Sequence, residues 1–254
     1  MTAPFFQGNP EKHTAADVAR FSAYARYFES SPLPVELKLA NFSKYVRRQD
    51  LCRFLARAEL FKLCLDLPGV IIECGSYAGG GLMTYAQLSS IYEPYNHQRR
   101  IYAFDSFCGF PGVSNKDQVG GSVPGVGDLH VHENIREEIL EGIKLQDENR
   151  ALGHIPKTEL VVGDALNTIP EFMADNPHIV VAMLYLDFDL YEPTKLAIET
   201  FYERMPKGAI LAFDEVCADK FPGETLALLE SVGIRHVALR KTSFDPYISY
   251  AILE

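Results

Sequence analysis

The chain has 254 residues, of which 47% are hydrophobic and 23% are charged. This composition is typical of a folded globular protein and excludes disordered, collagen-like and disulfide-scaffold classes. The length allows one enlarged domain or two small ones. The 34 acidic residues outnumber the 24 basic ones and give a formal net charge of −10, which opposes docking on nucleic acid or anionic lipid, so we expect neither partner.

No segment predicts a membrane span, because the longest apolar run, residues 179–186, is far shorter than the ~20 residues that a membrane helix needs. No basic cluster precedes an apolar stretch in residues 1–13, so we expect no secretory signal and a cytoplasmic location. The five cysteines form no C-x-x-C pair, and we expect reduced thiols rather than disulfides or a zinc site.

Short apolar runs alternate with helix-like segments from residue 68 onward. The apolar runs cover residues 70–74, 101–104, 160–162, 180–186 and 209–213, and the helical segments cover residues 80–93, 193–204 and 223–231. The runs are continuous rather than alternating, which indicates strands buried on both faces, as in a parallel sheet covered by helices.

The last part of the chain predicts two more strands, at residues 235–240 and 247–253. The link between them is too short for a parallel crossover, so the last strand must run antiparallel to its predecessor. The pattern predicts an α/β fold of the class I methyltransferase type. Its Rossmann-like, seven-stranded sheet would be mostly parallel, with an antiparallel C-terminal hairpin and helices on both faces.

Two domains are expected, an N-terminal helical extension over residues 1–67 and a binding domain over residues 68–254 with an insertion at about 109–150. Within the extension, residues 50–65 carry one apolar stripe, and residues 14–30 hold four aromatic side chains. The aromatic segment could be a lid, an oligomer surface or plain core covering. The glycine-rich residues 109–133 could be a mobile cover or a surface excursion.

A glycine-rich loop, Glu73-Cys74-Gly75-Ser76-Tyr77-Ala78-Gly79-Gly80-Gly81, follows the first strand. Glycine lets a ligand lie against the main chain at such a turn. The loop fails the P-loop pattern, because Gly81 and Leu82 stand where Lys and Ser/Thr should be, and Tyr77 breaks the dinucleotide pattern. Glu73, ahead of the loop, suits a cationic ligand better than a pyrophosphate.

Two acids end the second and third strands. Asp105 could accept both hydroxyls of a ribose, and Asp164 could address an adenine edge. Each of them could equally be a helix N-cap.

Further acids end the fourth and fifth strands, Asp187 and Asp189 on one and Asp214 and Glu215 on the other. Neighbouring strands lie ~4.8 Å apart, and two like charges ~4 Å apart repel by about 4 kcal/mol at an effective dielectric near 20. Such a cluster requires protonation or a cation, and its all-oxygen chemistry points to Mg²⁺, with Ca²⁺ or Mn²⁺ as alternatives. The alternative is that some of these acids are N-caps.

Over roughly residues 41–254 the chain resembles the macrocin O-methyltransferase (TylF/MycF) family. The resemblance rests on five runs: YVRRQ from Tyr45, the glycine-rich loop, DSFCGFP from Asp105, LDFDLYE from Leu186, and FDE from Phe213 with FPGE from Phe221. It implies an O-methyltransferase that uses S-adenosylmethionine (SAM) and Mg²⁺.

The resemblance also implies residue roles. Asp187, Asp214 and Glu215 would hold the metal, although Glu215 departs from the Asp-Asp pair of the family, and Asp189 would be the general base. The SAM-binding residues would be Glu73, Cys74, Gly75, Ser76, Gly79, Gly80, Asp105, Ser106, Phe107, Asp164 and Ala165.

The expected function is therefore methylation of a hydroxyl on a small molecule, a sugar or a glycosylated natural product, by a homo-oligomer. Vicinal hydroxyls would chelate the metal best. Alternatives are an NAD(P)-dependent oxidoreductase, which Tyr77 and the terminal hairpin disfavour, and a non-catalytic SAM-binding module. His130 and His132 are rival bases, and Tyr191 and Arg47 are candidates for substrate contact.

Overall fold

The structure is a computed structural model that describes residues 14–119 and 123–254. The chain divides into two compact units, Met1–Leu55 and Ala56–Glu254. The boundary falls inside helix α3 (Arg48–Leu63), whereas the sequence predicts it after residue 67. The predicted SAM and metal residues all belong to the second unit.

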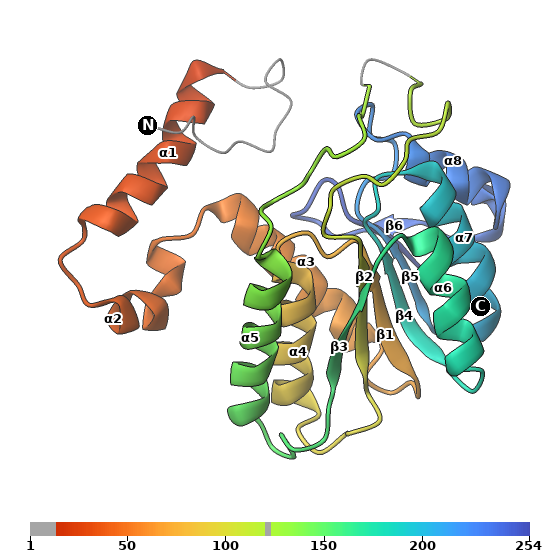
Figure 1. Ribbon diagram of the computed structural model, residues 1–254, viewed down its shortest axis with the longest axis horizontal. Helices are drawn as coiled ribbons and strands as arrows, with labels where there is room; N and C mark the ends of the chain where they lie inside the picture. The colour runs from red at the N-terminus through yellow and green to blue at the C-terminus, as the bar shows by residue number, and fades with distance from the viewer. Residues whose placement is uncertain (1–13, 120–122) are drawn as a thin grey trace. The chain divides into compact units, whose positions relative to one another are not determined.

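The second unit is built on a seven-stranded sheet with the order β3-β2-β1-β4-β5-β7-β6 (Figure 1). The strands are β1 (Val70–Cys74), β2 (Ile101–Asp105), β3 (Thr158–Val162), β4 (Val181–Leu186), β5 (Ile210–Phe213), β6 (Arg240–Lys241) and β7 (Ser249–Ile252). The first five pair in parallel, and β7 pairs antiparallel with both β5 and β6. This is the class I methyltransferase fold that the sequence predicts.

Helices cover both faces of the sheet (Figure 1). The C-terminal half of α3, with α4 (Gly80–Tyr92) and α5 (Ile135–Glu148), packs on one face. On the other face lie α6 (Ala165–Asp175), α7 (Tyr191–Phe201) and α8 (Gly223–Glu230). Because both faces are covered, every residue of β1, β4 and β5 is buried, which explains their uninterrupted apolar sequences.

Besides α6, which lies outside the predicted helical segments, the structure differs from the predicted elements in two places. The strand predicted over residues 235–240 is reduced to the two exposed residues of β6, and the 3₁₀ turn η4 (Ile234–His236) takes up its start. This strand is the outer edge of the sheet, so no neighbour buries a longer one. The segment 109–150 also contains α5, the crossover helix between β2 and β3, so the irregular part ends before Ile135.

The first unit contains α1 (Ala15–Ser30), α2 (Val35–Ala40) and the 3₁₀ turn η2 (Phe42–Lys44). Two of the α1 aromatics pack on the buried Tyr45, with ring centroids 5.4 Å away for Tyr27 and 5.3 Å away for Phe28. Those two aromatics therefore cover the unit's own small core. Within the described ranges, no helix combines the length and apolar character that a membrane crossing requires.

Candidate active site

Gly75 is the point where the ends of β1 and β4 meet. Its N–H donates to the Phe104 carbonyl at 2.8 Å, while the Asp187 N–H donates to the Cys74 carbonyl at 2.7 Å. Gly75 has a φ of +92°, and a Cβ on it would lie 1.9 Å from the Asp187 carbonyl oxygen. Glycine is therefore required here so that the loop can approach the acidic end of β4.

The other loop glycines differ in what surrounds them. A Cβ on Gly79 would lie 2.8 Å from the Ile139 side chain, and one on Gly81 would lie 1.8 Å from the Glu73 carboxylate. A Cβ on Gly80 would meet nothing within 4 Å. Gly80 thus faces open space, whereas Gly75, Gly79 and Gly81 make room for the protein's own groups.

Asp105 holds the glycine-rich loop through main-chain amides. Its carboxylate accepts hydrogen bonds from the amides of Ser76 at 2.7 Å, Tyr77 at 2.8 Å and Phe107 at 2.7 Å. Tyr77 and Phe107 both have positive φ, +48° and +54°, so these bonds stabilise two unfavourable backbone conformations. Both Asp105 oxygens are engaged by main-chain amides, so Asp105 holds the loop in addition to any contact that it makes with a ribose.

The remaining predicted SAM residues lie at the same edge of the sheet. Asp164 accepts from the Leu166 amide at 3.0 Å, so it is the N-cap of α6, the alternative noted from its sequence, and Ala165 is the first residue of that helix. Ser106 donates its hydroxyl to the Gly109 carbonyl at 2.7 Å. Cys74 is fully buried in the core on the α6–α7 face.

Glu73 points away from open space and into the protein. Its side chain is 1% exposed, and its Oε1 lies 3.9 Å from Nη2 of Arg57. Burial raises the pKa of Glu73 to about 7, while the positive charge of Arg57 opposes that rise. Glu73 is thus a buried acid beneath the loop.

Three carboxylates converge beside the glycine-rich loop. Asp187 and Asp189 follow β4, and Glu224 lies in the first turn of α8. Each offers one oxygen, and these three oxygens lie within 4.8 Å of one another. Asp189 has a φ of +63°, a conformation that non-glycine residues seldom adopt.

Glu224 is the most buried member of this acidic cluster of Asp187, Asp189 and Glu224. It is 0% exposed, and its Oε2 accepts from the Glu215 amide at 3.1 Å. Its other oxygen, Oε1, has no hydrogen-bond partner among the described residues. Burial first, and then the charges of Asp189 and Asp214, raise the pKa of Glu224 well above its usual value.

The predicted metal ligands Asp214 and Glu215 lie outside the acidic cluster, among the residues that the structure describes. Asp214 is 2% exposed, and its Oδ1 accepts the hydroxyl of Tyr185 at 2.5 Å. Glu215 contributes its main-chain amide to Glu224. The structure therefore keeps Asp187 in the cluster, joins Asp189 to it and adds Glu224, which the sequence-based ligand set does not include.

Arg57 is a second residue that the sequence-based site omits. It comes from the part of α3 that belongs to the second unit, and its Nη2 lies 3.4 Å from Oδ2 of Asp187. Its guanidinium also lies over the Tyr185 ring, 4.8 Å from the centroid. A positive charge here stabilises the neighbouring carboxylates. The only signal in the sequence is one arginine within a helix that carries an apolar stripe.

Lys116 and Asp117, between β2 and α5, are bound to α7 and α8. Asp117 is 1% exposed and accepts the Tyr191 amide at 2.6 Å, which caps α7 from 74 residues away. The Lys116 ammonium donates to the Tyr191 hydroxyl at 2.9 Å and to Glu230 at 2.5 Å. The side chain of Tyr191 is therefore engaged inside the protein, which differs from its predicted role in substrate contact.

The other candidates also have partners away from the acidic cluster. His130 shares a hydrogen bond with the Phe107 carbonyl at 3.3 Å, and His132 lies 3.4 Å from Glu138. Arg47 belongs to the first unit, where it pairs with Asp50 at 2.5 Å. Neither histidine is a member of the acidic cluster.

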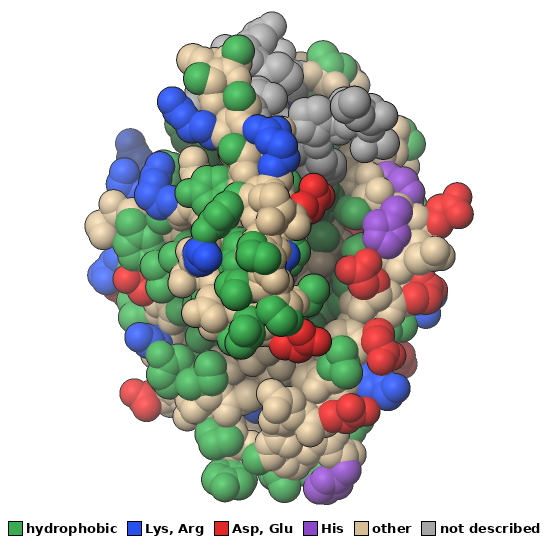
Figure 2. Space-filling view, turned by 90° about the vertical axis from the view of Figure 1, so that its left-hand side faces the viewer, with side chains coloured by type: hydrophobic (Ala, Val, Ile, Leu, Met, Phe, Trp, Pro, Cys, Tyr) green, Lys and Arg blue, Asp and Glu red, His purple; other side chains and the backbone are tan. Residues whose placement is uncertain are grey.

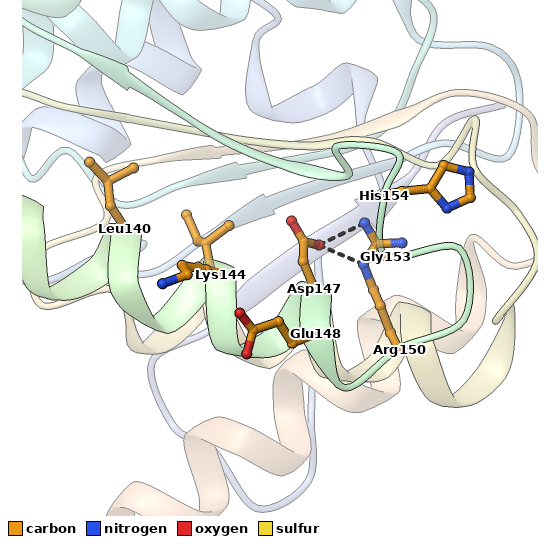
Figure 3. Close-up of a pocket in the computed structure, with 8 residues that line it drawn as sticks. Leu140, Lys144, Asp147, Glu148, Arg150, Gly153 and His154 are labelled. Carbon is orange, nitrogen blue, oxygen red and sulfur yellow. Dashed lines mark hydrogen bonds and ion pairs between the residues drawn. The ribbon is translucent and has the colours of Figure 1, made fainter.

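A cavity of about 570 Å³ lies at the far end of α5 (Figure 3). Asp147 and Arg150 form an ion pair in it at 2.6 Å, and Arg150 also donates to the Ile155 carbonyl at 2.5 Å. Because α5 leads into β3, this end lies at the amino edge of the parallel sheet. The cavity is thus away from the acidic cluster, and its charged groups stabilise the end of a helix.

The surface near α5 is acidic. The helix exposes Glu137, Glu138, Glu141 and Glu148 to solvent. Figure 2, which views the molecule from the left-hand side of Figure 1, shows acidic side chains gathered along one side of that face. The helix also exposes Arg136 and Lys144, so its surface carries charges of both signs with the acids in excess.

The sequence and the fold were compared with known proteins. The profile of the macrocin-O-methyltransferase (TylF) family matches residues 62–224. A curated relative from Streptomyces olivaceus, 8-demethyl-8-(2,3-dimethoxy-alpha-L-rhamnosyl)-tetracenomycin-C 4'-O-methyltransferase, is 25% identical over 175 residues. That match covers 65% of this chain and 62% of the relative, so the chain spans less than two thirds of the relative's length.

Two solved structures are similar over almost their whole length. A crystal structure of CalS11, a calicheamicin methyltransferase, is 35% identical with a TM-score of 0.89, covering 98% of this chain and 95% of that one. An apo structure of CalS11, there named TDP-rhamnose 3'-O-methyltransferase, is 33% identical with a TM-score of 0.81, covering 98% and 97%. The O-methyltransferase NovP shares the fold at 20% identity, with a TM-score of 0.57 and 79% of each chain covered. The family profile and the first two structures together show that this chain belongs to the macrocin-O-methyltransferase (TylF) family.

Proposed function

We propose that the protein transfers a methyl group from SAM to a hydroxyl on the sugar of a natural product, with the help of a divalent cation. The observation that carries this proposal is the contact between the glycine-rich loop and the acidic end of β4 at Gly75 and Asp187. It brings a candidate donor site and a candidate proton acceptor to one place. Family membership and the methyltransferase names of the relatives support the same chemistry.

The glycine-rich loop fits SAM. Gly80 leaves open space beside the main chain, and Ser76 is 5% exposed with a hydroxyl that has no partner among the described residues. These are the features that a polar ligand against a backbone would use. The loop with Ser106, Phe107, Asp164 and Ala165 would hold the donor, and Asp105 would act by fixing the loop.

The acidic cluster fits a divalent cation. Its groups are carboxylates, the ligands that Mg²⁺ and Ca²⁺ prefer, and the buried Oε1 of Glu224 lacks a donor among the described residues. A bound cation would supply electrostatic stabilisation of a developing alkoxide and would orient neighbouring hydroxyls.

The chain's own residues then have two tasks. The methyl carbon of SAM is already activated by its sulfonium, so the protein must place the acceptor oxygen in line with it. The protein must also accept the hydroxyl proton, and Asp189 is the proposed base because it lies in the turn after β4. Its positive φ fixes the direction of that side chain within the turn.

The acceptor class follows from the relatives. The names of CalS11 and of the Streptomyces olivaceus enzyme both refer to a rhamnose or rhamnosyl group. A 6-deoxyhexose also carries the neighbouring hydroxyls that a cation could orient. We therefore propose an acceptor of this sugar class, either as a nucleotide sugar or already attached to an aglycone.

The test is methyl transfer from radiolabelled SAM to TDP-rhamnose and to rhamnosylated aglycones, with and without EDTA. Transfer that EDTA abolishes and Mg²⁺ restores is expected, and Asp189→Asn should lose most of the turnover while keeping SAM binding. SAM binding without transfer to any acceptor would indicate a non-catalytic module. Transfer that persists in EDTA would overturn the cation but not the methyltransferase.

A further inference from the structure

We infer that Glu224, rather than Glu215, completes the cation site together with Asp187 and Asp189. This inference rests on the proposed function, which supplies the reason for a cation. It assigns a ligand role to Glu224, the last residue of the FPGE run, to which the sequence analysis gives no role.

The spacing of the acidic cluster suits one ion. The three oxygens lie within 4.8 Å of one another. Oxygens on opposite sides of a Mg²⁺ are about 4.2 Å apart, and those on opposite sides of a Ca²⁺ are about 5 Å apart. Ligand oxygens on adjacent sides of either ion lie closer together than this, so separations within 4.8 Å are compatible with one divalent cation of either kind.

The second observation is the unpartnered oxygen of Glu224. The residue is 0% exposed, so bulk solvent does not reach Oε1, which has no hydrogen-bond partner among the described residues. The other oxygen is held by the Glu215 amide at 3.1 Å, which fixes the orientation of the carboxylate. A buried carboxylate with one oxygen oriented and the other without a donor is suited to a cation.

The backbone around Glu224 is held against the turn that carries the two aspartates. A Cβ on Gly223 would lie 2.4 Å from the Tyr191 nitrogen and 2.6 Å from Oδ1 of Asp117. The start of α8 thus lies directly on the start of α7. This contact sets the distance between Glu224 and Asp189.

The alternative ligands lie outside the acidic cluster among the described residues. The Asp214 carboxylate accepts the Tyr185 hydroxyl at 2.5 Å, and the main-chain amide of Glu215 orients Glu224. Each member of the acidic cluster offers one oxygen to it.

The experiment compares two isosteric variants, Glu224→Gln and Glu215→Gln, in the full chain without SAM or acceptor. Binding of Mn²⁺ is measured by electron paramagnetic resonance and calorimetry. Loss of groups that only support a ligand weakens metal binding 10- to 100-fold, so Glu224→Gln should weaken it at least about tenfold. Glu215→Gln should change the affinity for Mn²⁺ by less than about threefold, because the main-chain amide of residue 215 still orients Glu224.

Thermal melting in EDTA checks the folding of each variant. Glu224→Gln replaces a buried acid whose charged form is unfavourable there by a neutral group of the same shape, so its melting temperature without metal should equal or exceed that of the wild type, while the stabilisation by Mn²⁺ should disappear. If Glu224→Gln does not fold, Glu224→Asp keeps the charge but shortens the reach, and it should show the same loss of affinity.

The outcomes separate the two proposals. Wild-type binding that Glu215→Gln abolishes and Glu224→Gln preserves would overturn this inference and leave the proposed function intact. A wild-type chain that binds no Mn²⁺ at millimolar concentration would overturn the cation in both. If methyl transfer then proceeds at the same rate with and without EDTA, the proposed SAM-dependent methyl transfer stands without the cation.

Discussion

The carbonyl oxygen of Asp187 occupies the space that a side chain on Gly75 would need, because it would lie 1.9 Å from a Cβ at that position. The glycine therefore serves the contact between two strand ends as well as any ligand. Gly80, five residues later in the same loop, faces open space instead. Gly75 therefore has a structural role in the loop, whereas Gly80 is the position at which a ligand could approach the main chain.

Gly75→Ala should lower the stability of the protein, whereas Gly80→Ala should mainly weaken ligand binding. Alanine at residue 75 meets a backbone oxygen and a φ of +92°, so we expect a loss of about 3 kcal/mol or more in the free energy of unfolding. Gly80→Ala should change stability by about 1 kcal/mol or less but weaken SAM binding about fivefold. Urea unfolding and SAM calorimetry measure the two effects, and equal stability of the two variants would contradict the assignment.

Asp105→Asn should loosen the glycine-rich loop. The asparagine replaces one acceptor oxygen by a donor, so at least one of the amides of Ser76, Tyr77 and Phe107 loses its partner. We expect a loss of about 1–3 kcal/mol in stability together with weaker SAM binding. Asp164→Asn is the control for stability, because asparagine caps a helix as well as aspartate does. Unchanged stability of Asp105→Asn would show that its bonds do not hold the loop.

Glu73 should make the stability depend on pH. Its pKa is raised to about 7 in the folded protein, so between about pH 4.5 and 7 the folded state binds more protons than the unfolded state. The contribution of Glu73 to the free energy of unfolding is therefore full below about pH 4.5 and is lost as the pH rises through 7. The free energy of unfolding falls by up to about 1.4 kcal/mol per pH unit over that range.

The comparison that isolates this effect is the wild type against Glu73→Gln, by urea unfolding in EDTA at pH 5, 6, 7 and 8. The stability of the wild type relative to the variant should fall up to about pH 7 and then level off. A difference that stays constant over this range would show that Glu73 does not titrate there.

Asp117→Ala should release the segment before α5 from α7. The substitution leaves the Tyr191 amide without its cap and removes the acceptor of the Ser114 amide and hydroxyl, at a cost of about 1–3 kcal/mol. Faster hydrogen exchange at Tyr191 is the specific signature. Lys116→Ala, one residue away, removes an ion pair in which both side chains are 41% exposed and a hydrogen bond to the Tyr191 hydroxyl, but it leaves the Tyr191 amide capped, so hydrogen exchange at Tyr191 should stay slow.

The course of the sheet could be predicted from the sequence because its strands are buried on both faces. Residues 70–74 are predicted and observed as β1 with the same bounds. The antiparallel ending follows from a link too short for a crossover. The helix α5 was missed although Ile135, Ile139 and Ile143 recur every four residues and are buried, because the glycines before it make the whole segment look irregular.

Within the candidate site, the sequence could predict which strand ends carry acids but not where each acid points. Asp105 and Asp164 have similar positions after β2 and β3, yet Asp105 binds the amides of a distant loop while Asp164 caps its own helix. Side-chain direction depends on neighbours far away in the chain, so a strand pattern does not contain it.

The sequence by itself determined the family, the fold and the edge of the sheet where the charged groups gather, because these depend on local hydrophobic runs and short motifs. Only the tertiary structure decided that Asp187 and Asp189 meet Glu224 while Asp214 turns to Tyr185. The meeting depends on how α8 lies against α7 and on which donors each carboxylate finds in a buried space. Those contacts join residues far apart in the chain, and no local pattern of residues specifies them.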